Sequence, residues 1–254
     1  MKDGGRRAWI AATVVSFVVM IAVNAMANAL PINGLTTGAI SDSYRIWFVP
    51  AGYVFSIWGL IYLALAVFTW ALSTRATPEA VAQPVRKLFV ANCLTNAAWI
   101  FTWHHLLVEL SVLLMLVLLG TLIAIYVRLR TGPTQTQRWT LLAPASLYLA
   151  WICVATIPNI SAMLVKRGWD GAPLTGQTWA AVMMVVATAI ILGLAFRFRD
   201  VVPPLVLGWA LVGILVKFPA EPLMRAVGVT MLVALAASVL GLGFRLARAG
   251  RDTP

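Results

Sequence analysis

The sequence predicts an all-α integral membrane protein with eight transmembrane helices. Its 254 residues are 61% hydrophobic and only 11% charged, and their mean hydropathy is +0.91. Soluble domains are about one quarter charged, so this chain has too few charges to cover a surface in water. Apolar runs of about 20 residues recur along it, and each is long enough for a helix to cross the hydrocarbon core of a bilayer.

The first apolar run is longer than the roughly 7–15 residues of a signal-peptide core, so we expect it to remain as a helix. Spans three and four should meet in a tight turn near Glu109, and "KFPAEP" at 217–222 should separate the last two, because proline and charge interrupt a helix. The polar stretch "PINGLTTGAISDSYRI" predicts an ordered loop or short helix after span one. The eight predicted spans cover residues 8–30, 47–73, 86–104, 107–128, 139–165, 177–197, 201–218 and 222–246.

The distribution of cations predicts the orientation of these spans. Of the 19 lysines and arginines, 14 fall at one set of span ends; the other five are Arg45, Lys166, Arg167, Lys217 and Arg225. By the positive-inside rule, both termini should be cytoplasmic, in a bacterial inner membrane. The loops expected outside are 31–46, 104–110, 166–176 and 217–222. The net charge of +11 is then explained by helix ends, and we expect no nucleic-acid partner.

No catalytic or metal-binding pattern is visible in the sequence. All eight acidic residues fall in loops or at span ends, and Cys93 and Cys153 lie inside apolar runs, where small buried side chains are expected. An ion-coupled transporter usually carries an ionisable residue within its spans. We therefore expect a binding protein rather than an enzyme, with no catalytic residue and no metal.

The 11 tryptophans fall into two groups. Seven lie near span ends, as in the aromatic belt at a membrane surface. The other four lie deeper, where an indole N–H needs a partner or a polar cavity, so they either pack in the core or contact a ligand. In span three, Asn92, Asn96 and Trp99 share one helix face, although such asparagines also serve as hydrogen bonds between helices. The deep tryptophans are Trp58, Trp99, Trp151 and Trp209.

His104 and His105 end span three, next to Trp103. A neutral imidazole can ligate the metal of a haem or a chlorophyll-type pigment. Their position beside Trp103 favours polar residues that mark the membrane surface.

Three stretches carry a family resemblance: "WFVPAGYVFSIWGLIYLALA" at 47–66, "TNAAWIFTW" at 95–103 and "LYLAWICVATIPN" at 147–159. In this order they resemble the tryptophan-rich sensory protein family, TspO/MBR, also called the translocator protein or peripheral benzodiazepine receptor family. Its pattern is Pro-Pro-x-Trp-x-Phe followed by Trp and Tyr, then Asn-x-x-Trp, then Tyr-x-x-Trp with a later Asn. Tyr53 stands where the family usually has tryptophan. The matching residues are Pro50, Phe55, Trp58, Tyr62, Asn96, Trp99, Tyr148, Trp151 and Asn159.

The resemblance covers roughly residues 8–165 and implies a five-helix bundle, residues 1–170, with a ligand cavity near the first long loop. Residues 171–254 would be a three-helix transmembrane extension. Family members are associated with tetrapyrrole sensing, transport and light-dependent porphyrin breakdown. A flat macrocycle suits stacking on indole and phenol rings. Asn159 is expected to tie helices together, and Arg45 either meets ligand propionates or is solvated. The predicted ligand-binding residues are Tyr53, Trp58, Tyr62, Asn96, Trp99, Tyr148 and Trp151.

We therefore expect a membrane receptor or sensor that binds a porphyrin or similar planar hydrophobic ligand in an aromatic-lined cavity. No cofactor is expected to be obligatory; a bound porphyrin or other tetrapyrrole is the group that the resemblance suggests. The alternatives are a carrier of hydrophobic metabolites and a structural subunit of a larger membrane complex. Expected partners are membrane lipid, the planar ligand, and a second copy or other subunit through residues 177–246, where "GWALVGILVKF" supplies small residues.

Overall fold

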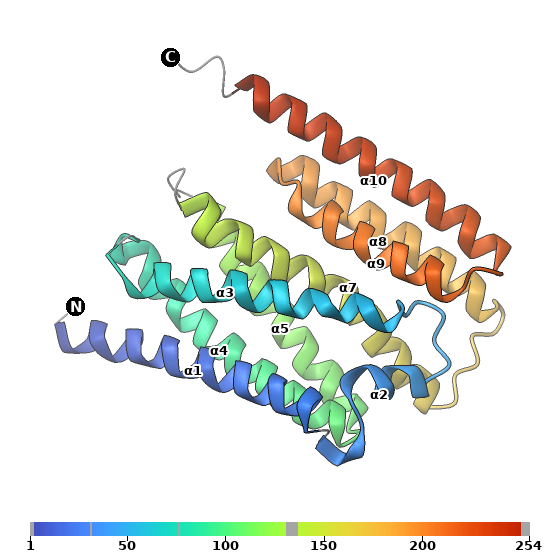
Figure 1. Ribbon diagram of the computed structural model, residues 1–254, viewed down its shortest axis with the longest axis horizontal. Helices are drawn as coiled ribbons and strands as arrows, with labels where there is room; N and C mark the ends of the chain where they lie inside the picture. The colour runs from blue at the N-terminus through green and yellow to red at the C-terminus, as the bar shows by residue number, and fades with distance from the viewer. Residues whose placement is uncertain (1–2, 31, 76, 131–136, 250–254) are drawn as a thin grey trace. The chain divides into compact units, whose positions relative to one another are not determined.

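The computed structural model describes residues 3–30, 32–75, 77–130 and 137–249. Within these ranges the chain forms nine α-helices and no strand (Figure 1). The predicted all-α class is confirmed. Lys2 and Arg251, two of the cations used to predict the orientation, lie outside the described residues.

Eight long helices follow the predicted spans in order, and the short helix α2 lies in the first long loop, where an ordered loop or short helix was predicted. The α-helices are α1 Asp3–Ala29, α2 Thr37–Ser43, α3 Ile57–Ser73, α4 Glu79–His104, α5 Val108–Arg130, α7 Ala143–Lys166, α8 Gly176–Phe198, α9 Val202–Lys217 and α10 Pro222–Ala249. Two short 3₁₀ segments are η1 Ile32–Gly34 and η2 Gly52–Ser56, and η3 Arg138–Leu142 is a π-helical turn that leads into α7.

Six helical segments in the described part of the chain are long and apolar enough to cross a membrane. They are α1, α3 with η2, α5, α7 with η3, α8 and α10. Of the two remaining long helices, α9 has 16 residues and is short for a span, while α4 has 26 but carries Glu79, Arg86 and Lys87 in its first turns. The protein is an all-α integral membrane protein.

The predicted start of span two at residue 47 is wrong. Residues 47–51 are irregular, Gly52–Ser56 form a 3₁₀ turn, and the α-helix begins only at Ile57. Pro50 explains the delay, because it has no backbone N–H and disfavours helical backbone in the residue before it. The irregular segment finds a backbone partner elsewhere: the Ala51 N–H donates to the Gly213 carbonyl at 3.1 Å.

Both predicted breaks between spans are confirmed. The turn between α4 and α5 has left-handed backbone at Leu106 (φ 58°), and the Leu107 N–H returns to the Thr102 carbonyl at 2.9 Å. This arrangement satisfies a carbonyl at the helix end. The second break lies between Lys217 and Pro222, where proline begins α10.

Packing divides the chain into two compact units. Unit one comprises residues 1–44 and 56–152, and unit two comprises residues 45–55 and 153–254. In unit one, α4 packs against α1 and α5; in unit two, α8, α9 and α10 pack against one another (Figure 1). The irregular segment that precedes α3 thus belongs to the same unit as the last three helices. The predicted division at residue 170 stays a prediction.

A buried arginine ties three helices of unit one together. Arg86 of α4 is fully buried, and its Nε donates to the Leu72 carbonyl at the end of α3 at 2.7 Å. Its Nη1 donates to Glu79 Oε1 at 2.7 Å, and Arg6 of α1 donates to the other oxygen of that carboxylate at 3.0 Å. The arginine therefore supplies a donor to an end carbonyl of α3 that lacks a partner within the helix, while Glu79 balances its charge.

Candidate functional site

Four aromatic rings from two helices gather in unit one, and we name them the aromatic cluster: Trp58, Tyr62, Tyr148 and Trp151. Trp58 is central, with ring centroids 5.5 Å from Tyr62, 6.0 Å from Tyr148 and 6.1 Å from Trp151. The Tyr62 ring is nearly parallel to it (25°), whereas the other two present their edges (67° and 85°). These are the separations and geometries that aromatic pairs prefer.

Helical periodicity explains how the rings meet. Trp58 and Tyr62 are four residues apart on α3, and Tyr148 and Trp151 are three apart on α7, so each pair occupies one face of its helix. Tyr148 and Trp151 are fully buried, but Trp58 and Tyr62 keep part of their surface exposed. The two α3 rings are therefore the accessible side of the cluster.

A buried hydrogen-bonded chain lies behind the cluster. Asn96 of α4 donates from Nδ2 to the Tyr148 hydroxyl at 2.8 Å, and its Oδ1 accepts from Asn24 Nδ2 of α1 at 2.7 Å. Asn24 also donates to the Met20 carbonyl at 2.9 Å. The sequence reasoning missed Asn24, and its only signal was a polar residue inside an apolar run. These hydrogen bonds hold the Tyr148 ring in place and give the buried amides of Asn24 and Asn96 hydrogen-bond partners.

Trp99, one turn beyond Asn96 on α4, is buried and stacks on Trp103, with ring centroids 6.0 Å apart and planes 14° apart. The Trp103 indole donates to the Thr37 carbonyl at 3.3 Å. Within the described residues, the Trp99 indole N–H has no hydrogen-bond acceptor. A buried donor without an acceptor costs free energy. A ligand with a hydrogen-bond acceptor could therefore bind to the Trp99 N–H.

Tyr53 belongs to unit two, unlike the other six predicted ligand-binding residues. It is exposed, and its ring meets Trp209 edge to face at 5.4 Å. The Trp209 indole donates to the Val54 carbonyl at 3.0 Å, so this deep tryptophan serves to hold the segment before α3. Among the described residues, the contacts found for Tyr53 lie within unit two.

Trp103 and His104, which were expected to mark the membrane surface, are both buried in the protein under the first long loop. His104 Nδ1 lies 3.1 Å from the Ile32 carbonyl and Nε2 lies 3.0 Å from Thr37 Oγ1. A carbonyl only accepts, so Nδ1 carries the proton and, in the neutral ring, Nε2 accepts from the hydroxyl. Because both ring nitrogens contact protein atoms, His104 holds η1 and α2 against the end of α4. His105, its neighbour, is exposed.

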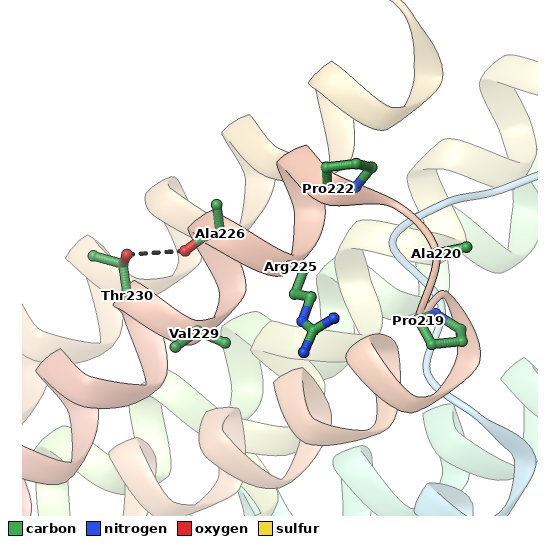
Figure 2. Close-up of a pocket in the computed structure, with 7 residues that line it drawn as sticks. All are labelled: Pro219, Ala220, Pro222, Arg225, Ala226, Val229 and Thr230. Carbon is green, nitrogen blue, oxygen red and sulfur yellow. Dashed lines mark hydrogen bonds between the residues drawn. The ribbon is translucent and has the colours of Figure 1, made fainter.

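Unit two has a shallow hollow of about 710 Å³ beside the start of α10 (Figure 2). Its walls are mostly small or apolar, and Arg225 is the one charged residue that lines it. The Thr230 hydroxyl donates to the Ala226 carbonyl at 2.9 Å and is thus used within the helix. With neither aromatic rings nor convergent polar groups among its lining residues, the hollow lacks the features of a binding site.

The described part of the chain is thus an all-α membrane protein in which tryptophan, tyrosine and asparagine side chains gather between helices. The family model described as "TSPO-like protein" matches residues 8–244, and the chain belongs to this family. No curated protein and no solved structure matches the chain. Membership supports a sensor- or receptor-type role in a membrane in general terms.

The family match extends beyond the region of the three motifs. The motifs indicated a likeness over residues 8–165, but the match continues through α8, α9 and most of α10. The family model therefore covers most of the three-helix extension as well.

Proposed function

We propose that the protein is a membrane receptor of the sensor type that binds a porphyrin or similar planar hydrophobic molecule at the aromatic cluster. The observation that supports this most is the convergence on Trp58 of three further aromatic rings from two helices. Trp58 and Tyr62 stack on each other and are only partly buried, so part of their aromatic surface stays accessible. Large planar ligands bind by stacking on such rings.

The polar groups nearby would orient the ligand rather than attract it from a distance. Asn96 and Tyr148 are held by hydrogen bonds, and the Trp99 N–H is a donor without an acceptor. Every side chain of the proposed site is neutral. Binding would then depend on stacking and apolar burial, and its affinity should change little with salt concentration, because screening acts on charges.

Titration of the detergent-solubilised protein with protoporphyrin tests this function. We expect a saturable shift of the porphyrin absorption band, weakened about tenfold when Trp58→Leu removes the central ring, on the scale of about 1 kcal/mol for each lost ring contact beyond its area. Trp139→Leu is the control, since that indole is 73% exposed on η3. Binding that does not saturate, or an unchanged affinity in a Trp58→Leu/Tyr62→Leu variant, would remove the proposal.

The two alternative functions have their own tests. A carrier of hydrophobic metabolites would move a labelled ligand into proteoliposomes, whereas a receptor would only bind it. A structural subunit or homodimer would associate through residues 177–246, where α10 exposes Leu240 and Phe244. Loss of a stably co-purifying partner in a Leu240→Trp variant would favour that function.

For the membrane, we propose the bacterial inner membrane with both termini cytoplasmic. The uneven distribution of lysine and arginine between the two sets of span ends supports this orientation. In this orientation, the loops that follow His104, Lys166 and Lys217 face the outside.

A further inference from the structure

Unit two contains a second pocket, lined by three tryptophans, that the proposed function does not use. We name it the tryptophan pocket and define it by Trp47, Trp169 and Trp179, with Arg45 and Asp170 also in its lining. Arg45 and Trp47 come from the irregular segment before α3, Trp169 and Asp170 from the loop after α7, and Trp179 from the first turn of α8. Its volume is about 90 Å³.

The rings are fixed by specific contacts. The Trp179 indole donates to the Gly171 carbonyl at 2.7 Å, and the Trp169 and Trp179 centroids lie 5.4 Å apart. The Trp47 indole packs directly against Gly176. Any larger residue at position 176 would place its Cβ atom 2.7 Å from the Trp47 indole nitrogen, which is too close. Gly171 has positive φ (94°), which a side chain would strain. Two glycines therefore make room for two of the indoles, and the aromatic wall is preformed.

Size excludes the ligand of the proposed function. A cavity of roughly 150 Å³ holds one benzene molecule. The tryptophan pocket, at about 90 Å³ and open on one side, can seat only part of a small headgroup. A porphyrin is much larger. The pocket is a separate site and its occupant must be a small group.

The charges at the pocket indicate the chemistry of that group. Arg45 and Asp170 contribute one charge of each sign, both at exposed positions, and the Asp170 carboxylate is held by the Ala172 N–H at 2.9 Å. Aromatic enclosures recognise alkylated ammonium groups through the negative faces of their rings. A guanidinium matches phosphate or carboxylate geometry with two parallel hydrogen bonds. The pocket thus combines features for a cation and an anion within a small space.

We propose that the tryptophan pocket binds a zwitterionic group of the phosphocholine type. The alkylated ammonium would enter among the three indoles beside Asp170, and the phosphate would contact Arg45. The group could be a lipid headgroup or a free soluble zwitterion, since the chemistry is the same.

The test uses the full chain in nanodiscs of phosphatidylglycerol and detects binding by saturation-transfer NMR of the N-methyl protons. The probes are phosphocholine and the cation tetramethylammonium. Both should bind saturably, and Trp169→Leu should weaken both about tenfold because a cation–π contact is lost. Trp169→Phe, which keeps an aromatic face, should retain most of the affinity. Arg45→Gln should weaken phosphocholine but leave tetramethylammonium unchanged.

Controls separate this site from a folding defect and from the porphyrin site. Trp139→Leu should leave both probes unchanged, and Trp169→Leu should leave protoporphyrin binding unchanged, because the aromatic cluster lies in unit one. Nanodiscs of phosphatidylcholine identify the source: competition with free phosphocholine indicates a lipid headgroup, and no competition indicates a soluble zwitterion. Absence of saturable phosphocholine binding in phosphatidylglycerol, or equal affinity in folded Trp169→Leu protein, would overturn the proposal.

Discussion

The amide of Asn96 donates a 2.8 Å hydrogen bond to the hydroxyl of Tyr148, 52 residues further along the chain. This bond joins α4 to α7 inside unit one, and the Tyr148 ring in turn meets Trp58 edge to face. The polar chain from α1 and the aromatic cluster are therefore mechanically connected, and a change in one should affect the other.

Tyr148→Phe should destabilise the protein and weaken porphyrin binding together. The substitution keeps the ring but leaves the buried Asn96 amide without its acceptor, which costs about 1–3 kcal/mol. The midpoint of thermal unfolding in detergent and a porphyrin titration measure the two effects. Tyr53→Phe is the control, because the Tyr53 ring is exposed. An unchanged midpoint in Tyr148→Phe would contradict the connection.

The two arms of the Glu79 ion pair should differ in strength. Glu79→Gln leaves the fully buried Arg86 without its counter-charge, and we expect a loss of about 1–2 kcal/mol, since the carboxylate is itself partly exposed. Arg6→Gln removes only the partly exposed arm and should cost less than about 1 kcal/mol. Thermal unfolding of the two variants gives the comparison. Equal losses of stability would show that the ion pair with buried Arg86 contributes no more than the pair with Arg6.

His104→Ala should loosen the first long loop while His105→Ala should not. His104 contacts Ile32 and Thr37 through its two ring nitrogens, whereas His105 is exposed. Hydrogen–deuterium exchange across residues 32–43 should rise in the His104 variant and remain near wild type in the other. Equal exchange rates in the two variants would show that His104 does not hold the first long loop.

Thiol labelling in intact cells tests the orientation. In a Cys93→Ala/Cys153→Ala background, Arg167→Cys should react with a membrane-impermeant reagent added outside. Arg128→Cys should react only after the membrane is permeabilised, because the positive-inside rule places it in the cytoplasm. The reverse pattern would invert the proposed topology.

Helices were predictable from local pattern, and contacts between them were not. Apolar runs of about 20 residues located the eight long helices, and proline with charge located the break before Pro222. Helical periodicity also predicted that Asn96 shares a face with Trp99. What these faces meet depends on packing between helices, which no local pattern contains.

The errors have the same origin. The burial of His104 under the first long loop was not foreseen, because its partner Ile32 lies 72 residues earlier. Asn24 was overlooked because its acceptor, Asn96, is equally distant in sequence. The start of α3 was placed too early because Pro50 and its apolar neighbours continue the hydrophobic run although the backbone there is not helical.

The bond from Ala51 to Gly213 has a consequence for attempts to obtain a minimal protein. A chain shortened after α7 would lose the acceptor for Ala51, the indole that donates to Val54, and the Phe218 ring that lies 4.9 Å from Trp47. The segment before α3 would then have unpaired backbone groups and would lose the helices it packs against. The last three helices are part of the scaffold that shapes the entrance to the second span, so truncation to five helices would unravel that entrance rather than isolate a smaller receptor.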